Sequence, residues 1–324
     1  MPSINVLETP HIYELTAPAN PKLPVLVFVH GWLLSRHYWQ PLVQLLQSEY
    51  QCLIYDARGF GESQISAKSE SESLSLVSTQ KSTIKGSYSE IDIEVDTATD
   101  SPQDYSLNGY ANDLGCLLEI LEIEQAWLVG HSLGGSIALW TADLYPEVVK
   151  GVTCLNAGGG IYLKEEFERF RSAGEQLLKF RPRWLLFIPG LNLVFSRMMV
   201  ARPLAIRWGR QRVLDFIEAD GEAALGALLE STTESEVHLL PQLVSRLQQP
   251  VYFIAGEKDK VMEIKYVNHL ASFHHLFTSE ESNVFQINNC GHLGMLEAPN
   301  EVASIINNVL SEYQAQLERS AKQE

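Results

Sequence analysis

Cysteine is scarce in this sequence. Four cysteines are spread over 324 residues without a CxxC pair, which excludes a disulfide framework and favours a reducing compartment. The sequence also lacks an HExxH motif, a cluster of cysteine and histidine, and a Walker loop. We therefore predict neither a metal nor a nucleotide or other cofactor.

Basic residues and long hydrophobic runs are also few. Lys and Arg number 24 against 40 Asp and Glu, and the resulting net charge of −16 excludes a general nucleic-acid binder because it repels phosphate backbones. The most apolar window, residues 184–200, is interrupted by Pro189, Gly190 and polar residues and is too short to span a bilayer. No basic segment followed by an apolar run begins the sequence, so we expect no signal peptide and a cytoplasmic protein.

Short β-branched runs alternate with longer amphipathic ones, which is typical of βα units around a parallel sheet. Strands are expected at 25–29, 52–55, 126–129, 151–155, 251–255 and 284–287. Helices are expected at 38–47, 107–121, 136–144, 264–273 and 301–317. The pattern predicts an α/β fold with a mostly parallel, doubly wound sheet, whose core comprises residues 1–63, 105–160 and 250–324.

Two stretches interrupt this alternation. Residues 64–104 hold ten serines and have eight acids against three bases, so they bury too little apolar surface to offset their ordering entropy. We expect a disordered insertion there. Ile91, Ile93 and Val95 alternate with acids, a pattern that also allows one short edge strand. Residues 161–249 are helical in pattern, and we expect an inserted helical lid because long structureless loops are rare in compact domains.

A Gly-x-Ser-x-Gly motif occupies residues 130–134, between a predicted strand and a predicted helix. A serine on such a tight turn is lifted above the sheet edge, and small flanking residues are needed because the backbone approaches its neighbours closely. Ser132 is therefore the candidate nucleophile.

A nucleophilic serine needs a base, and the base needs an acid that orients it. His292 and Asp259 each follow a predicted core strand, which places both on the same sheet edge as Ser132. They also follow the serine in the order Ser, Asp, His. Glu257 is the nearest substitute for Asp259. The other position for the acid, just after the strand that ends at residue 155, holds Asn156, which cannot serve.

The oxyanion of a tetrahedral intermediate requires two backbone N–H donors. Leu133 follows the nucleophile and Trp32 follows the first predicted core strand, so these two residues are the candidate donors. Gly31 allows the backbone to turn toward the site. We expect His30 to brace this loop rather than to contact substrate.

Five motifs together resemble the α/β-hydrolase superfamily, and specifically its serine-nucleophile, lid-bearing, esterase-like branch. In chain order they are HGW at 30–32, DARGFGES at 56–63, GHSLGG at 130–135, GEKD at 256–259 and CGH at 290–292. The resemblance covers about 23–63, 105–160 and 250–315 and implies a Ser132–His292–Asp259 triad. It also implies that Asp56 and Arg58 belong to a structural turn. The chain departs from the pattern at 64–104, where relatives tend to have a shorter link.

The predicted lid is unevenly charged. Residues 164–212 carry eleven bases and four acids, whereas residues 213–238 carry seven acids and neither Lys nor Arg. Either the two halves pair with each other, or the basic and aromatic half meets an anionic substrate or membrane. Trp184 and Phe187 are candidate substrate-binding residues, because the core motifs supply little apolar wall.

Serine at the nucleophile position suits acyl transfer, whereas relatives that open epoxides or displace halide have Asp there. We predict a serine hydrolase that cleaves a carboxylic ester of a small or medium lipophilic substrate through an acyl-enzyme. The alternatives are a C–C bond hydrolase or lyase that acts on an acidic substrate with the same triad, and a ligand receptor that retains the triad. The expected partner is the small-molecule ester, with no nucleic acid and a weak peripheral membrane contact through the lid. The oligomeric state stays open.

Overall fold

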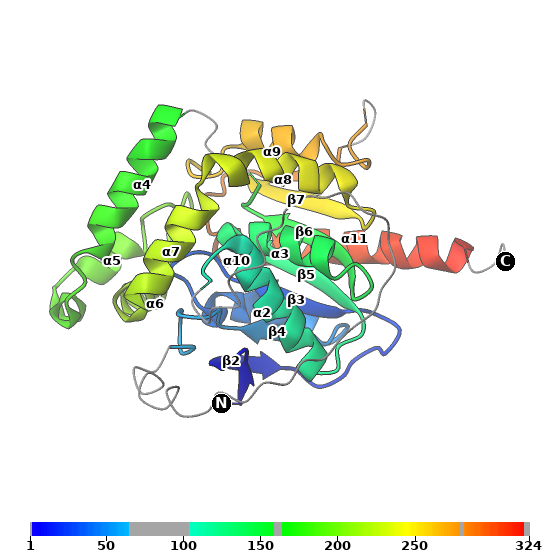
Figure 1. Ribbon diagram of the computed structural model, residues 1–324, viewed down its shortest axis with the longest axis horizontal. Coiled ribbons are helices and arrows are strands. Elements are labelled where there is room, and N and C mark those ends of the chain that lie inside the picture. Colours follow the sequence, from blue (N-terminus) through cyan, green and yellow to red (C-terminus); the bar gives the residue numbers. More distant parts are fainter. Residues whose placement is uncertain (1, 65–103, 159–163, 279–281, 321–324) are drawn as a thin grey trace, which may run out of the picture.

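The computed structural model describes residues 2–64, 104–158, 164–278 and 282–320. Residues 65–103, with most of the predicted insertion and the alternating Ile91, Ile93 and Val95, lie outside the described residues. The described chain forms one sheet with helices on both faces and a group of helices that extends to one side (Figure 1).

The sheet has eight strands in the order β1-β2-β4-β3-β5-β6-β7-β8. The pairs from β4 through β8 are parallel, and only the β1–β2 and β2–β4 pairs of this sheet are antiparallel. The predicted α/β fold with a mostly parallel sheet is therefore confirmed. The strands are β1 (Ser3–Val6), β2 (Thr9–Leu15), β3 (Val25–Val29), β4 (Cys52–Tyr55), β5 (Ala126–His131), β6 (Val149–Leu155), β7 (Val251–Gly256) and β8 (Val284–Ile287).

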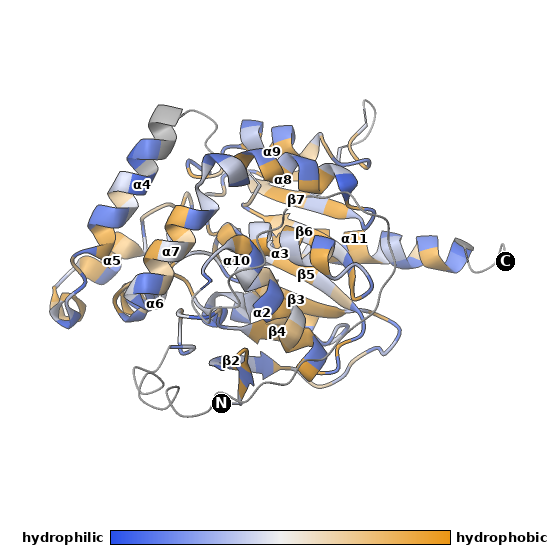
Figure 2. Cartoon of the chain, viewed as in Figure 1, coloured by the Kyte–Doolittle hydropathy of each residue, from blue (hydrophilic) through white to orange (hydrophobic). Residues whose placement is uncertain are grey.

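Helices cover both faces of this sheet. Those that alternate with its strands are η1 (Arg36–Trp39), α1 (Gln40–Leu46), α2 (Leu107–Ile120), α3 (Leu133–Leu144), α9 (Ile264–Ala271), α10 (Gly294–Glu297) and α11 (Pro299–Ser320). Side chains along β3 alternate between two cores: Leu26 and Phe28 pack with α1 and α11, whereas Val27 and Val29 pack with α2 and α3. Because both faces are covered, the parallel strands are apolar on both sides, as Figure 2 shows for β3.

The hairpin of β1 and β2 carries no clear signal in the sequence. Its two turn residues, Leu7 and Glu8, both have positive φ (46° and 65°), a geometry that asparagine and glycine usually provide. The strands are also largely exposed or half-buried, so they lack a continuous apolar run. The hairpin extends the sheet through antiparallel pairing of β2 with β4.

Residues 164–246 form the helices of the predicted lid. They are α4 (Lys164–Leu178), η3 (Arg183–Phe187), α5 (Leu191–Phe195), α6 (Ile206–Glu218), α7 (Gly221–Ser231) and α8 (Glu234–Arg246). In Figure 1, α4, α5 and α6 extend to the left of the sheet, on the side opposite the end of α11. Helix α8 contacts α3 and α9, and its Leu243 and Val244 join the core beneath them.

No described helix is both long and apolar enough to cross a membrane.

Candidate active site

Ser132 lies on the turn between β5 and α3, where the backbone is strained. Its φ of 52° and ψ of −120° are values that a residue with a β-carbon rarely adopts. The Ser132 N–H donates to Leu155 O (3.2 Å), and Ser132 O accepts from the Gly135 N–H (2.9 Å). Helix α3 then begins at Leu133, earlier than predicted, because the turn leads directly into it.

Two positions around this turn require glycine. A β-carbon on Gly130 would lie 2.2 Å from Gly134 O, and a β-carbon on Gly134 would lie 2.2 Å from Val29 O. Both distances are far below van der Waals contact, so side chains there would push the turn away from its neighbours. The glycines of the motif therefore hold Ser132 close to the loop that follows β3.

His292 lies between Ser132 and Asp259 and is hydrogen-bonded to both. Its Nδ1 is 2.8 Å from Asp259 Oδ2, and its Nε2 is 3.2 Å from Ser132 Oγ. Because a carboxylate only accepts hydrogen bonds, Nδ1 carries the ring proton and Nε2 accepts from the serine hydroxyl. Two hydrogen bonds thus connect the three side chains that the sequence indicates.

The carboxylate of Asp259 is buried yet strongly supported. Burial by itself raises its pKa, but the His292 ring and two backbone N–H groups bring the pKa below the usual value. These N–H groups belong to Val261 and Met262 and donate to Asp259 Oδ1 at 2.8 and 3.0 Å. Asp259 is therefore ionised near neutral pH and able to orient the imidazole.

Asn156 supports the same acid from the position after β6. Its Nδ2 donates to Asp259 Oδ2 (3.0 Å) and to Gly291 O (3.0 Å), while its Oδ1 accepts from the Gly294 N–H (3.2 Å). The sequence excludes Asn156 as the acid, and no pattern in it indicates this bridging role. Glu257, the nearest substitute for Asp259, instead lies at the surface and pairs with the neighbouring lysine.

Two other histidines brace the site in their neutral forms. His131 Nε2 donates to the carbonyl of His292 (2.7 Å), and burial lowers the pKa of His131 to about 3. His30 Nδ1 donates to Gly31 O, while its Nε2 accepts from the Ala57 N–H. Because both rings hold backbone atoms and His30 holds the loop as expected, neither is available as the base for Ser132.

The predicted oxyanion donors flank the serine. Leu133 is the first residue of α3, and a β-carbon on Gly31 would lie 3.2 Å from Ser132 Cβ, so the loop with Trp32 passes beside the nucleophile. Within the described residues, neither the Trp32 nor the Leu133 backbone N–H has an acceptor. The Trp32 indole Nε1 donates to Ala224 O (2.8 Å), which ties this loop to α7 of the lid.

A single carboxylate holds the loop that carries His292. Glu297, which is buried, accepts hydrogen bonds from four backbone N–H groups, two beside His292 and two in the lid segment before α6. The donors are Gly291 (2.9 Å), Leu293 (3.1 Å), Ala201 (2.7 Å) and Arg202 (2.8 Å). The His292 N–H also donates to Met199 O (2.8 Å), so the lid backbone contacts the histidine directly.

The two candidate substrate-binding residues lie on the lid surface. Trp184 is 53% exposed and Phe187 is 82% exposed. The Trp184 ring packs against Phe180 in an edge-to-face arrangement, with centroids 5.9 Å apart. Both rings are therefore largely open to solvent, and their contact with substrate stays a prediction.

Three buried or half-buried arginines of the predicted lid donate hydrogen bonds within the protein. Arg181, Arg202 and Arg212 each donate to two or more backbone carbonyl oxygens. A guanidinium engaged in this way does not grip a substrate carboxylate, so these residues give no support to the alternative of C–C cleavage on an acidic substrate.

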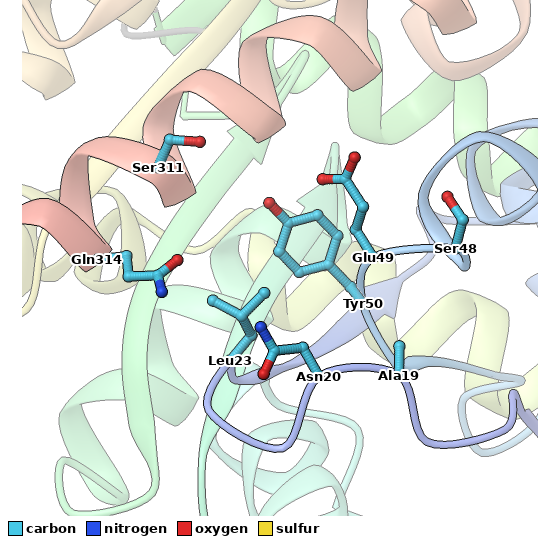
Figure 3. A pocket seen from close by; sticks show the side chains of 8 residues that line it. All are labelled: Ala19, Asn20, Leu23, Ser48, Glu49, Tyr50, Ser311 and Gln314. Atoms are coloured by element: carbon cyan, nitrogen blue, oxygen red, sulfur yellow. The ribbon is translucent and has the colours of Figure 1, made fainter.

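A surface hollow lies apart from this site, between the segment before β3, the end of α1 and α11 (Figure 3). It is lined by Ala19, Asn20, Leu23, Ser48, Glu49, Tyr50, Ser311 and Gln314. None of the candidate site residues lines it.

Comparisons with known proteins bear on the fold and the family of this chain. The family model of the α/β hydrolase fold matches residues 24–299. An uncharacterized hydrolase of Bacillus subtilis, YugF, is 24% identical over 293 residues, which is 89% of this chain and 90% of the relative. The bifunctional esterase/perhydrolase DCH of Acinetobacter calcoaceticus is 23% identical over 74% of this chain and 75% of its own length.

A solved structure shares the fold. The thermophilic esterase from Thermogutta terrifontis superposes with a TM-score of 0.67 at 22% identity, covering 97% of this chain and 99% of the esterase. The family match and the two relatives support hydrolase activity, and the chain belongs to the α/β-hydrolase-fold family.

Proposed function

We propose that the chain is a serine hydrolase that cleaves carboxylic esters of small or medium lipophilic substrates. The observation that carries the proposal is the placement of His292, hydrogen-bonded to Ser132 on one side and to Asp259 on the other. A serine hydroxyl is a weak nucleophile by itself, and a neutral imidazole in this position can remove its proton as the hydroxyl attacks.

The proposed reaction has two halves. Ser132 Oγ attacks the ester carbonyl carbon while its proton passes to His292 Nε2, and the resulting oxyanion binds the N–H groups of Trp32 and Leu133. The C–O bond to the alcohol then breaks, and the alcohol leaves with the proton from His292. Water attacks the acyl-enzyme in the same manner, which releases the carboxylic acid and restores the serine.

Asp259 has a constant role in both halves. Its ionised carboxylate holds the imidazole in the tautomer that accepts from Ser132, and it stabilises the imidazolium that forms. The relatives add a coarser argument, because two of them are described as esterases. The alternative on an acidic substrate would use the same triad, so the serine does not separate the two. An ester is favoured because Arg181, Arg202 and Arg212 already donate to the protein's own backbone.

Hydrolysis of chromogenic p-nitrophenyl esters tests the proposal. The wild type should release a rapid burst of nitrophenol, up to the enzyme concentration, followed by steady turnover. Ser132→Ala should lower kcat by a factor of roughly 10³ or more. Ser136→Ala, which removes a hydroxyl from the same helix, is the matched control and should leave kcat unchanged.

The same assay separates the hydrolase from the receptor. Tight binding of the ester with almost no turnover in the wild type would instead indicate a receptor that retains the triad. Turnover that survives in Ser132→Ala would contradict the assignment of the nucleophile.

A further inference from the structure

Exposed apolar side chains are concentrated on one part of the lid. Of the eighteen large hydrophobic residues that are exposed in the described chain, nine lie between residues 177 and 206. We call these nine the outer lid face: Leu177, Phe180, Trp184, Phe187, Leu193, Val194, Met198, Met199 and Ile206. Single exposed apolar residues are ordinary, but nine within one stretch of thirty residues point to an interaction surface.

The exposure does not come from a segment that fails to pack. Leu185, Leu186, Leu191 and Phe195 of the same stretch pack against the inner side of α6. Their sequence neighbours on the outer lid face remain exposed. Both η3 and α5 therefore have apolar residues on two sides, and in each only the side toward α6 is covered. Figure 2 shows the apolar colour of the segment around α5, at the end of the lid.

The same stretch is basic and contains no acid. Between Glu175 and Asp215 there is neither Asp nor Glu, while eight Lys and Arg residues occur. Five of these bases are exposed: Lys179, Arg183, Arg197, Arg207 and Arg210. In the described part of the chain none of the five forms an ion pair, whereas Arg202 pairs with Glu301. These five bases therefore form no ion pair with the acidic half of the lid, residues 213–238.

We propose that the outer lid face docks peripherally on an anionic lipid bilayer. Exposed aromatic and aliphatic side chains enter the boundary between head groups and acyl chains, and the flanking bases meet the head groups. A second copy of the chain is a poorer occupant, because a two-fold interface would bring two acid-free basic surfaces together. The proposal goes beyond ester hydrolysis and does not depend on it.

The docking surface is connected to the candidate active site by the backbone. Met199 belongs to the outer lid face, and its carbonyl accepts from the His292 N–H. Met198 and Met199 follow α5 in the chain, and Ala201 and Arg202 then donate to Glu297. A bilayer that touches this face would therefore lie against the segment that contacts the histidine, which suits a lipophilic substrate delivered from the membrane.

Sedimentation with vesicles tests the proposal without requiring turnover, so its failure leaves the proposed ester hydrolysis untouched. Vesicles of phosphatidylcholine alone are compared with vesicles that also contain phosphatidylglycerol, at low and at high salt. One basic residue near an anionic surface contributes about fivefold in affinity, so Arg183→Ala with Arg197→Ala should weaken binding about twenty-fivefold. High salt should weaken wild-type binding because it screens these charges.

The apolar contribution has its own variant and control. Phe187→Ser should weaken binding to anionic vesicles about tenfold, because the ring no longer enters the boundary region. Phe273→Ser, an exposed phenylalanine outside the lid, is its matched control, and Arg319→Ala is the control for the arginine pair. Both controls should bind like the wild type.

Three results would overturn the proposal. The first is no binding to anionic vesicles at low salt, and the second is equal binding by the wild type and Phe187→Ser. The third is a dimer in vesicle-free solution, measured by light scattering, that Phe187→Ser dissociates. This last result would assign the outer lid face to self-association.

Discussion

Removal of the Glu297 carboxylate should loosen the loop that carries His292. The carboxylate accepts from the N–H groups on both sides of the histidine, at Gly291 and Leu293, and from two N–H groups of the lid segment. In Glu297→Ala these four N–H groups lose their acceptor. Glu301→Ala is the matched control, because Glu301 is exposed and its carboxylate pairs only with Arg202 among the described side chains.

The expected cost follows from the number of lost acceptors. A buried N–H group without an acceptor costs about 1–3 kcal/mol, and water that enters the space left by the side chain recovers part of this. We therefore expect Glu297→Ala to lower the free energy of unfolding by about 4 kcal/mol, the lower end of the sum over four groups. Glu301→Ala should lower it by less than about 1 kcal/mol, as is usual for an exposed ion pair.

Activity should fall as well as stability. A displacement of a reacting group by about 1 Å can cost about 10²-fold in rate, so kcat of Glu297→Ala on p-nitrophenyl acetate should fall by about that factor. KM should change little, because Glu297 is not placed to contact the ester. Glu297→Gln keeps one acceptor oxygen and should fall between the wild type and alanine in both properties.

Urea unfolding followed by circular dichroism gives the stability, and initial rates give kcat. Glutamine also keeps the interpretation testable if the alanine variant does not fold. Unchanged kcat in a folded Glu297→Gln or Glu297→Ala, with stability equal to that of Glu301→Ala, would refute the view that this carboxylate positions His292.

Three further outcomes are expected. Asn156→Ala should lower kcat about tenfold, measured by initial rates, since Asp259 loses a hydrogen bond to a charged group worth about 1.5–3 kcal/mol; unchanged kcat would show that Asp259 needs no support from β6. Gly134→Ala should prevent folding or destabilise the chain by several kcal/mol in urea, because its β-carbon meets Val29 O, whereas Gly190→Ala, with open space around it, should cost only about 1 kcal/mol. His131 is held neutral by burial, with a folded pKa of about 3 against about 6.5 in the unfolded chain, so the unfolded chain takes up its proton first as pH falls. Between pH 7 and about 5 the wild type should therefore lose about 2 kcal/mol of stability relative to His131→Gln, and parallel stability curves for the two proteins would contradict this.

The fold follows from the sequence where burial is complete. Strands β3 and β4 have the bounds that the apolar runs predict, because a parallel strand covered on both faces leaves few polar positions. The β1–β2 hairpin could not be predicted, since Leu7 and Glu8 adopt turn geometry that usually requires glycine or asparagine. Pairing of β2 with β4 stabilises the hairpin despite the poor turn propensity of these two residues.

Some residues of the candidate site can also be predicted from the sequence and others cannot. Ser132, His292 and Asp259 are found from motifs because each follows a strand end, and parallel topology brings strand ends together. Asn156 and Glu297 were missed because their roles depend on backbone N–H and carbonyl groups of other segments. No spacing in the sequence reports a contact between a lid loop near residue 200 and the histidine loop near residue 292.

The position of Trp184 and Phe187 depends on tertiary packing in the same sense. An aromatic cluster in a lid predicts either a pocket wall or an exterior surface, and the sequence pattern is the same for both. Which of them occurs is decided by packing: Leu185 and Leu186 turn toward α6, and Trp184 and Phe187 are left outside.

Covalent labelling with a fluorophosphonate, followed by mass spectrometry of the digested protein, tests the central claim most directly. A serine that is activated by His292 and Asp259 attacks the phosphorus, displaces fluoride and keeps the phosphonyl group. The account predicts one stoichiometric adduct on the peptide that contains Ser132, no adduct in Ser132→Ala, and much slower labelling in His292→Ala. An adduct on another residue, or labelling of Ser132→Ala at the wild-type rate, would contradict it.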